Sequence, residues 1–211
     1  PKRMALVGYG SGMSAGAALT HAELESLDIM EIEEAVIAAS PFFECINNKP
    51  FADPRTHLIL EDGRIHLTYI DKTYDVIVSE PSNPWMAGVS NLFTVDYYRH
   101  VRDRLAPNGI FGQWIQIYEI SPRTVKTIYA TIQEVFPHMI VFHSGTGDTL
   151  VVASSRPIVR RWEEFKARFD QPKVRESFRM AGITDAPSLL AYFIASGDQV
   201  KKFLSDVPLR N

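Results

Sequence analysis

The sequence predicts an α/β fold in which a doubly wound, mostly parallel sheet is flanked by helices. Short apolar runs alternate with amphipathic stretches between residues 4 and 154, a pattern typical of βαβ units. The 211 residues are 45% hydrophobic, which suits one sizeable globular core. A glycine-rich turn follows the first apolar run directly, as at the first strand–helix connection of such sheets.

The first two strands are each expected to lead into a helix. Residues 4–8 form a short apolar run, which predicts a strand, and small residues then continue as a helix to about residue 21. Residues 28–32 predict the second strand. The glutamates at the start of residues 33–40 suit the first turn of a helix, because its macrodipole favours negative charge there.

Two further strands are expected in the middle of the chain. Residues 58–60 predict a short third strand that ends at an Asp-Gly pair. Residues 74–79 predict the fourth, and its unbroken Asp-Val-Ile-Val run indicates burial on both faces. A helix is expected over residues 96–105, because the Pro-Asn-Gly sequence that follows stops a helix and favours a turn.

The last strands are expected to close the sheet. Residues 110–117 predict the fifth strand, and a Ser-Pro pair begins a helix over residues 122–135. Residues 139–142 and 150–153, joined by a Ser-Gly-Thr-Gly-Asp segment, predict an antiparallel hairpin. Five alternating strands and a C-terminal hairpin make seven strands, an arrangement similar to the Rossmann-like sheet of class I S-adenosylmethionine (SAM) methyltransferases.

We expect two parts, a ligand-binding domain over residues 1–156 and a C-terminal extension over residues 157–211 that packs on it. The extension is charged and helical in pattern, with breaks near Pro172, Gly182 and Pro187. The single cysteine, Cys45, excludes an intrachain disulfide and a multi-cysteine zinc site.

The charge and hydropathy of this segment argue against two classes of partner, nucleic acid and membrane. The formal net charge of −3 gives no electrostatic footprint for nucleic acid. No apolar run approaches the roughly 20 residues that span a bilayer, so we expect no membrane contact by this segment. We interpret this segment as a cytoplasmic piece of a longer protein. A membrane domain elsewhere in that protein would tether it to the membrane.

The glycine-rich turn is the first candidate site. Gly8, Gly10 and Gly12 stand at alternate positions, where glycine permits a tight turn and a close approach of ligand to backbone. A pyrophosphate-binding turn places its last glycine further into the helix, so this spacing favours a nucleoside. A tight strand–helix connection without a ligand is the structural alternative.

Two further strand ends carry acidic residues. Glu31 follows the glycines by about 20 residues, the spacing at which a carboxylate accepts hydrogen bonds from ribose hydroxyls. Its neighbours Glu33 and Glu34 fit a solvated helix start better. Asp62, beside Gly63, is placed to accept the exocyclic amine of adenine, although Asp-Gly is also a common turn. Such strand ends converge on one crevice in open α/β sheets.

The loop after the fourth strand, from Ser79 to Trp85, is the richest candidate. Its two prolines restrict the backbone, and it carries the carboxylate of Glu80 and the amide of Asn83. A rigid polar loop at a strand end favours a functional role. A proline-capped connection with Trp85 packed inward is the structural alternative.

These motifs resemble the polyamine aminopropyltransferases (spermidine and spermine synthases), in particular bacterial spermidine synthase-like proteins that are often fused to membrane segments. The resemblance covers residues 4–155 and is most specific over residues 74–98, YDVIVSEPSNPWMAGVSNLFTVDYY. It implies a co-substrate, decarboxylated SAM or SAM itself, and no metal. The residues that it implies for this co-substrate are Gly8, Gly10, Gly12, Glu31, Asp62, Gly63 and Ser79.

The resemblance also implies an acceptor site with two departures. Where the family has an Asp-x-x-Asp-Pro loop, Glu80 takes the place of the first Asp, the base for the attacking amine, and Asn83 replaces the second. His143 stands near the position of a family tyrosine that contacts the amine. Gln113 and Tyr118 are expected to line the acceptor side. The loss of one carboxylate predicts weaker attraction for a polyamine.

The predicted function is transfer of an aminopropyl group from decarboxylated SAM to a small amine acceptor, in a homodimer as the family resemblance implies. A positioned carboxylate that takes the proton of the amine contributes roughly 10² to 10⁴ in rate. Two alternatives stay open from the sequence. One is a methyltransferase that uses intact SAM, and the other is a non-catalytic nucleoside-binding domain of a larger protein.

Overall fold

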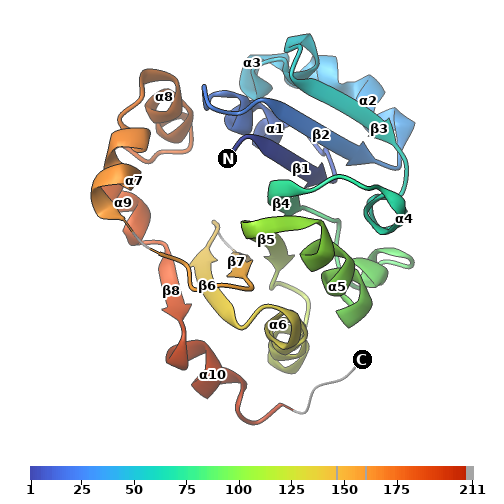
Figure 1. The fold of residues 1–211 in the computed structure, drawn as a ribbon, viewed down its shortest axis with the longest axis vertical. Helices are drawn as coiled ribbons and strands as arrows, with labels where there is room; N and C mark the ends of the chain where they lie inside the picture. Colours follow the sequence, from blue (N-terminus) through green and yellow to red (C-terminus); the bar gives the residue numbers. More distant parts are fainter. Residues whose placement is uncertain (146, 160, 208–211) are drawn as a thin grey trace.

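The chain folds around one eight-stranded sheet in the computed structural model, which describes residues 1–145, 147–159 and 161–207 (Figure 1). Residues 146, 160 and 208–211, which belong to the predicted hairpin linker and C-terminal extension, lie outside the described residues. The strands are β1 (Arg3–Val7), β2 (Ser26–Glu31), β3 (Thr56–Leu60), β4 (Tyr74–Ser79), β5 (Leu105–Gln116), β6 (His138–His143), β7 (Asp148–Ser154) and β8 (Phe193–Ser196).

Helices cover both faces of the sheet (Figure 1). One core cluster lies between the sheet and the two longest helices, α5 and α6, and a second lies between the sheet and α1. The α-helices are α1 (Met13–Leu19), α2 (Glu34–Ala39), α3 (Glu44–Asn47), α4 (Gly63–Tyr69), α5 (Val95–Arg104), α6 (Pro122–Val135), α7 (Trp162–Phe169), α8 (Pro172–Met180), α9 (Ala186–Leu190) and α10 (Asp198–Leu204). The 3₁₀ turns are η1 (Ser40–Phe43), η2 (Pro50–Ala52) and η3 (Val89–Phe93).

The strand order is β3-β2-β1-β4-β5-β7-β6-β8. The first five strands are parallel, and in register Val7 of β1 lies between Met30 of β2 and Ser79 of β4. The carboxyl ends of these strands are therefore level. Because the chain passes from β1 to β2 on one side and returns to β4 on the other, a crevice opens at this point, as in other doubly wound sheets.

The predicted fold class and the closing hairpin β6–β7 are confirmed. The burial of the fourth strand on both faces is confirmed too, since Ile77 belongs to one core cluster while Val76 and Val78 pack against the other. The count of seven strands was wrong, because β8 pairs antiparallel with β6. This strand is four residues long and lies half exposed at the sheet edge, so its sequence carries little hydrophobic pattern.

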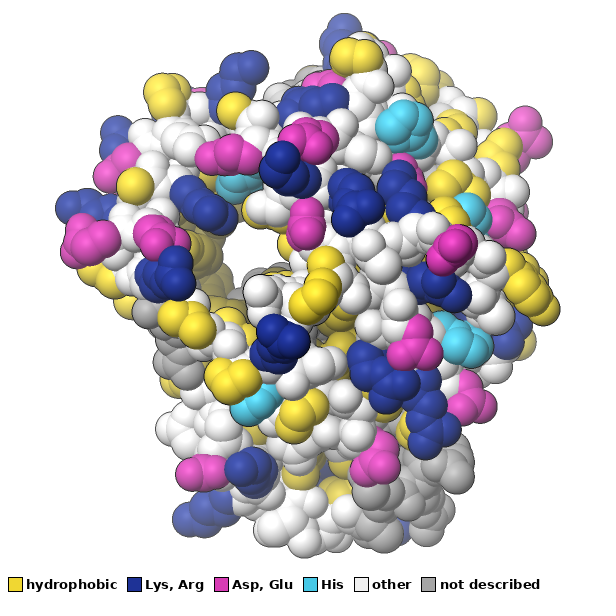
Figure 2. Space-filling view, viewed as in Figure 1, with side chains coloured by type: hydrophobic (Ala, Val, Ile, Leu, Met, Phe, Trp, Pro, Cys, Tyr) yellow, Lys and Arg dark blue, Asp and Glu magenta, His cyan; other side chains and the backbone are white. Residues whose placement is uncertain are grey.

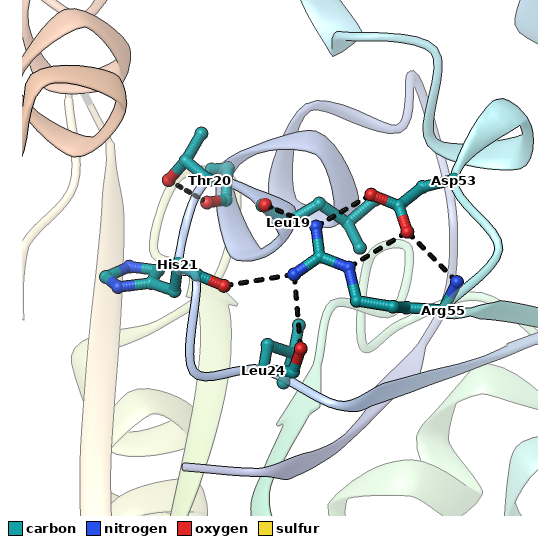
Figure 3. Close-up of polar contacts among 7 residues, drawn as sticks. Leu19, Thr20, His21, Leu24, Asp53 and Arg55 are labelled. Carbon is teal, nitrogen blue, oxygen red and sulfur yellow. Dashed lines mark hydrogen bonds and ion pairs between the residues drawn. The ribbon is translucent and has the colours of Figure 1, made fainter.

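Arg55 ties the start of β3 to the end of α1, the helix that follows the glycine turn (Figure 3). Its guanidinium donates hydrogen bonds to the carbonyl oxygens of Leu19 (2.7 Å), His21 (3.1 Å) and Leu24 (3.1 Å). It also forms an ion pair with Asp53 at 2.7 Å. The hydrogen bonds from Arg55 to the Asp53 carboxylate lower the pKa of Asp53 to about 2. The contacts fix α1, and with it the glycine turn, against β3.

Helices α7, α8 and α9 form a lobe beside the sheet, with a small core cluster of Phe169, Ile183 and Ala186. Figure 2 shows an opening between this lobe and the rest of the molecule. Within the described ranges, no helix is long and apolar enough to cross a membrane. Among those same residues, no cluster of three or more His, Cys, Asp or Glu side chains is arranged to hold a metal ion.

Candidate active site

A cavity of about 520 Å³ opens at the carboxyl ends of β1, β2 and β4 and at the start of α4. This size suits a small-molecule ligand. The structure brings six of the sequence-predicted residues together in its lining: Gly8, Gly10, Glu31, Asp62, Gly63 and Glu80. Residues that are up to 72 positions apart, from Gly8 to Glu80, therefore meet in one crevice, as the strand-end pattern predicted.

Gly8 is required by both its backbone angle and its surroundings. Its φ of 88° is in the left-handed region, and a Cβ atom there would lie 2.6 Å from the carbonyl oxygen of Glu80. Gly12 does not line the cavity. It precedes α1 with a φ of 79°, and a Cβ atom would collide with the side chain of Tyr9. The role of Gly12 in this structure is therefore to let the turn close.

Glu31 is buried, and two backbone amides hold its carboxylate. The Tyr9 amide donates to Oε2 and the Glu33 amide donates to Oε1, each at 2.9 Å. Each carboxylate oxygen can accept a second hydrogen bond through its other lone pair, so the group still has capacity for a ligand. Glu33 caps the N-terminus of α2 by accepting from the Ala35 amide at 3.2 Å, which confirms its interpretation as a helix start.

Asp62 and Gly63 begin a helix rather than a turn. Asp62 Oδ1 accepts from the Arg64 amide at 2.8 Å and so caps α4, a helix that the sequence analysis missed. Gly63 allows this helix to approach β1, since a Cβ atom would lie 2.7 Å from the side chain of Val7. Asp62 Oδ2 stays 3.8 Å from the Arg64 guanidinium, with lone pairs free for another donor.

Glu80 leaves β4 beside the glycine turn, and its amide donates to the Val7 carbonyl at 2.8 Å. Burial raises the pKa of Glu80, and the Ser14 side chain offsets this only in part. A carboxylate with a raised pKa is a stronger base than one in water, because the driving force for proton transfer to it is larger. The cavity therefore contains a group suited to accept a proton.

Ser79 and Gln113 lie beneath the cavity and not in its lining. Both are fully buried, and Gln113 Nε2 donates to the Ser79 carbonyl at 3.3 Å. The structure therefore places both residues under the point where Glu80 leaves the sheet.

Asn83 and Tyr118 connect two loops beside the cavity. The Tyr118 hydroxyl donates to Asn83 Oδ1 at 3.5 Å, and the Trp85 ring packs edge-on against Tyr118 with centroids 6.1 Å apart. Trp85 is 43% exposed, so the alternative in which it packs inward was wrong. His143 is exposed at the end of β6, pairs with Thr149 in the hairpin and does not line the cavity.

Sequence reasoning missed one wall of the cavity and its one cation. Residues 87–89, 91 and 92, at and before η3, also line the cavity, and Gly88 has a φ of 86° there. Of the described lining residues, Arg64 alone is basic. The acidic ones are Glu31, Glu33, Asp62 and Glu80. This balance favours a cationic ligand, because charges at short range in a cleft are weakly screened.

Comparison with known proteins gives consistent matches. The family model "Spermine/spermidine synthase domain" matches residues 1–145. A polyamine aminopropyltransferase of Thermococcus onnurineus is 31% identical over 111 residues, 53% of this chain and 39% of the relative. The crystal structure of a spermidine synthase in complex with the transition state analogue AdoDATO has a TM-score of 0.76 at 24% identity, over 97% of this chain and 70% of that chain. Human methyltransferase-like protein 13 in complex with SAH has a TM-score of 0.65 at 16% identity, over 85% and 82% of the two chains.

The matched lengths differ between this chain and its relatives. It spans 39% of the Thermococcus onnurineus relative and 59% of a polyamine aminopropyltransferase of Aquifex aeolicus, which is 26% identical over 76% of this chain. The solved structures confirm the predicted Rossmann-like methyltransferase fold.

Proposed function

This chain belongs to the spermine/spermidine synthase family, and on that premise we propose that it transfers an aminopropyl group from decarboxylated SAM to a small amine. The observation that carries the proposal is the convergence of Glu31, Asp62 and Glu80 on one cavity beside the glycine turn. Each of these carboxylates matches one need of the reaction. Glu31 would bind the ribose, Asp62 would bind the adenine, and Glu80 would accept a proton.

The donor would lie across the carboxyl ends of the strands. Glu31 would accept hydrogen bonds from the ribose hydroxyls, and Asp62 would accept one from the exocyclic amine of adenine. Gly8 and Gly10 would let the donor approach the backbone. The two amides that orient Glu31 support this arrangement, because they fix the carboxylate in advance.

The charge of the cavity supports the decarboxylated donor over intact SAM. Decarboxylated SAM carries a sulfonium and an ammonium, whereas intact SAM adds a carboxylate that needs a cationic or amide partner. The single cation in the described lining, Arg64, lies 3.8 Å from Asp62, at the end proposed for adenine. The acidic lining would therefore favour the dicationic donor.

In the reaction, the acceptor ammonium gives a proton to the Glu80 carboxylate, and the free amine attacks the propyl carbon bound to sulfur. A carbon–nitrogen bond forms, the carbon–sulfur bond breaks, and its electron pair stays on sulfur as neutral methylthioadenosine. The raised pKa of Glu80 supports its role as the base. The remaining acceleration would come from holding the amine in line with the carbon–sulfur bond.

The acceptor side would favour an amine with fewer charges than a polyamine. Asn83 is neutral and already accepts a hydrogen bond from Tyr118, so it offers a second ammonium little attraction. We propose that Asn83 and Tyr118 line the entrance for the acceptor. Gln113 would orient the loop from beneath, while His143 would reach the acceptor only if the hairpin moved.

Turnover in the full-length protein tests the proposal. We expect methylthioadenosine to form from decarboxylated SAM with at least one amine of a panel of mono- and diamines, and Glu80→Gln to lower the rate about 10² to 10⁴-fold. Equal rates for both proteins would exclude Glu80 as the base. Methylated amine from intact SAM would favour the methyltransferase, and tight donor binding without any product would favour a non-catalytic domain.

A further inference from the structure

Three unpaired polar groups lie beneath the cavity, between α5 and the carboxyl ends of β4 and β5. They are the hydroxyl of Ser79, the side-chain carbonyl of Gln113 and the hydroxyl of Tyr97, and each residue is at most 1% exposed. Across the part of the chain that the structure describes, none of these three atoms has a hydrogen-bond partner.

The three groups share one face of the sheet. Ser79 and Gln113 are register partners on neighbouring parallel strands, so their side chains point to the same side. Helix α5, which carries Tyr97, packs on that side. Burial has the largest effect on the pKa of Tyr97 and raises it. The polar interaction with the Ser79 hydroxyl lowers this pKa, and the charge of Asp62 raises it. Tyr97 therefore lies near Ser79, which is beneath the cavity, and near Asp62, which lines it.

A buried polar atom without a partner is costly, and native proteins satisfy such atoms with bound water. A buried water makes about two to four hydrogen bonds, and three oxygens on one face of the sheet can provide them. We propose that Tyr97, Ser79 and Gln113 share a bound water and that Tyr97 is thereby a positioning residue for Glu80. Because Ser79 directly precedes Glu80, holding the Ser79 side chain fixes the direction in which Glu80 leaves the strand. The effect on Glu80 rests on the proposed function, whereas the shared water does not.

Tyr97→Phe tests the proposal, and Tyr98→Phe is its matched control. Tyr98 is the next residue, is also fully buried, and also has an unpaired hydroxyl among the described residues. Its ring packs on Tyr97 (centroids 5.6 Å apart) and Phe111 (5.7 Å), and its pKa is raised by burial and by Tyr97, with no contribution from Ser79. Removal of a hydroxyl that binds water lowers the melting temperature, whereas removal of a dry, unpaired hydroxyl leaves it unchanged or raises it. We therefore expect Tyr97→Phe to lower the Tm and Tyr98→Phe not to lower it. An equal or raised Tm for Tyr97→Phe would overturn the shared water.

Kinetics separate positioning from a purely structural role. We expect Tyr97→Phe to lower kcat about tenfold, because a small misplacement of a reacting group slows the chemical step. The Kd for methylthioadenosine should change less than about twofold, since the donor contacts lie elsewhere. A lowered Tm with unchanged kcat would overturn the positioning role and keep the water.

A double-mutant cycle adds a readout that does not depend on activity. If Tyr97 and Ser79 hold the same water, Tyr97→Phe with Ser79→Ala should lower the Tm little more than the worse single variant does. Additive losses would contradict a shared water. Should the full-length protein transfer nothing to any amine, the proposed function fails, while the Tm measurements still decide whether the water is there.

Discussion

The backbone amide of Tyr9 donates a hydrogen bond of 2.9 Å to Oε2 of Glu31, and so joins the turn after β1 to the end of β2. Glu31 is thereby fixed in direction before any ligand arrives. Preorganisation of this kind favours affinity, because less freedom is lost when the ligand binds.

Glu31→Gln should weaken the binding of methylthioadenosine about tenfold or more. The amide NH₂ repels one of the two backbone donors and accepts no hydrogen bond from a ribose hydroxyl. Isothermal calorimetry measures the change. Glu34→Gln is the control, because Glu34 is exposed on α2 and lies outside the cavity lining, and its affinity should match that of the unmodified protein. Similar losses in both variants would contradict the ribose role.

Gly8→Ala should destabilise the protein far more than Gly10→Ala. Both glycines have positive φ, which costs an alanine about 1–2 kcal/mol. Only at Gly8 would the new Cβ also meet backbone, the carbonyl oxygen of Glu80 at 2.6 Å, while nothing lies within 4 Å of it at Gly10. Urea unfolding of the two variants separates the two contributions. Equal losses would show that the close approach of Gly8 to Glu80 is not part of the native structure.

Glu80→Gln should leave the stability at pH 7 unchanged or higher while the rate of transfer falls. Burial raises the pKa of Glu80 above 4.5, so ionisation of this group opposes folding. The penalty is absent below the unfolded pKa of about 4.3 and grows as pH rises through the higher folded pKa. In thermal unfolding from pH 4 to pH 7, the melting temperature of the variant should therefore rise relative to that of the unmodified protein as pH rises. A relative melting temperature of the variant that falls over this range would contradict the raised pKa.

Arg55→Lys should destabilise the protein by about 2–3 kcal/mol, because a lysine cannot bind three carbonyl oxygens and a carboxylate together. Arg99→Lys, at an exposed ion pair with Asp96, is the control and should cost under about 0.5 kcal/mol. Denaturant unfolding measures both. If the two variants lose the same stability, Arg55 does not hold α1 in solution.

Acid unfolding tests the same contact from the side of the carboxylate. Hydrogen bonds from Arg55 lower the pKa of Asp53 from 3.8 to about 2, so this group stabilises the fold above pH 3.8 and loses that effect as pH falls toward 2. The loss over this range should be smaller in Arg55→Lys. A steeper loss in the variant would contradict the lowered pKa.

The sequence was sufficient for the strands that alternate with helices, because burial of β1, β4 and the hairpin leaves continuous apolar runs. It was insufficient for β8, whose Phe193 and Ile194 are exposed and whose place depends on pairing with β6. Helix α4 was missed because Asp-Gly is locally ambiguous. The Asp62 cap and the packing of Gly63 against Val7 stabilise this helix in the folded chain.

For the site, the sequence predicted which residues lie at strand ends. It could not predict which of them line the cavity and which are buried beneath it. Glu31 ends a strand, and Asp62 and Glu80 follow strands, so the topology brings them together. Gln113 sits on a strand too, but its register with Ser79 places it under the cavity. Tyr97 had no signal, because a tyrosine on the buried face of a helix has the pattern of an ordinary core residue.

The acidic cavity is proposed to favour the decarboxylated donor. Calorimetric titration of the full-length protein with decarboxylated SAM and with intact SAM tests this preference most directly. The account predicts that the decarboxylated donor binds at least about tenfold more tightly, and that the preference shrinks as salt is raised, since screening weakens attraction between charges. Tighter binding of the carboxylated donor, or no binding of either, would contradict it.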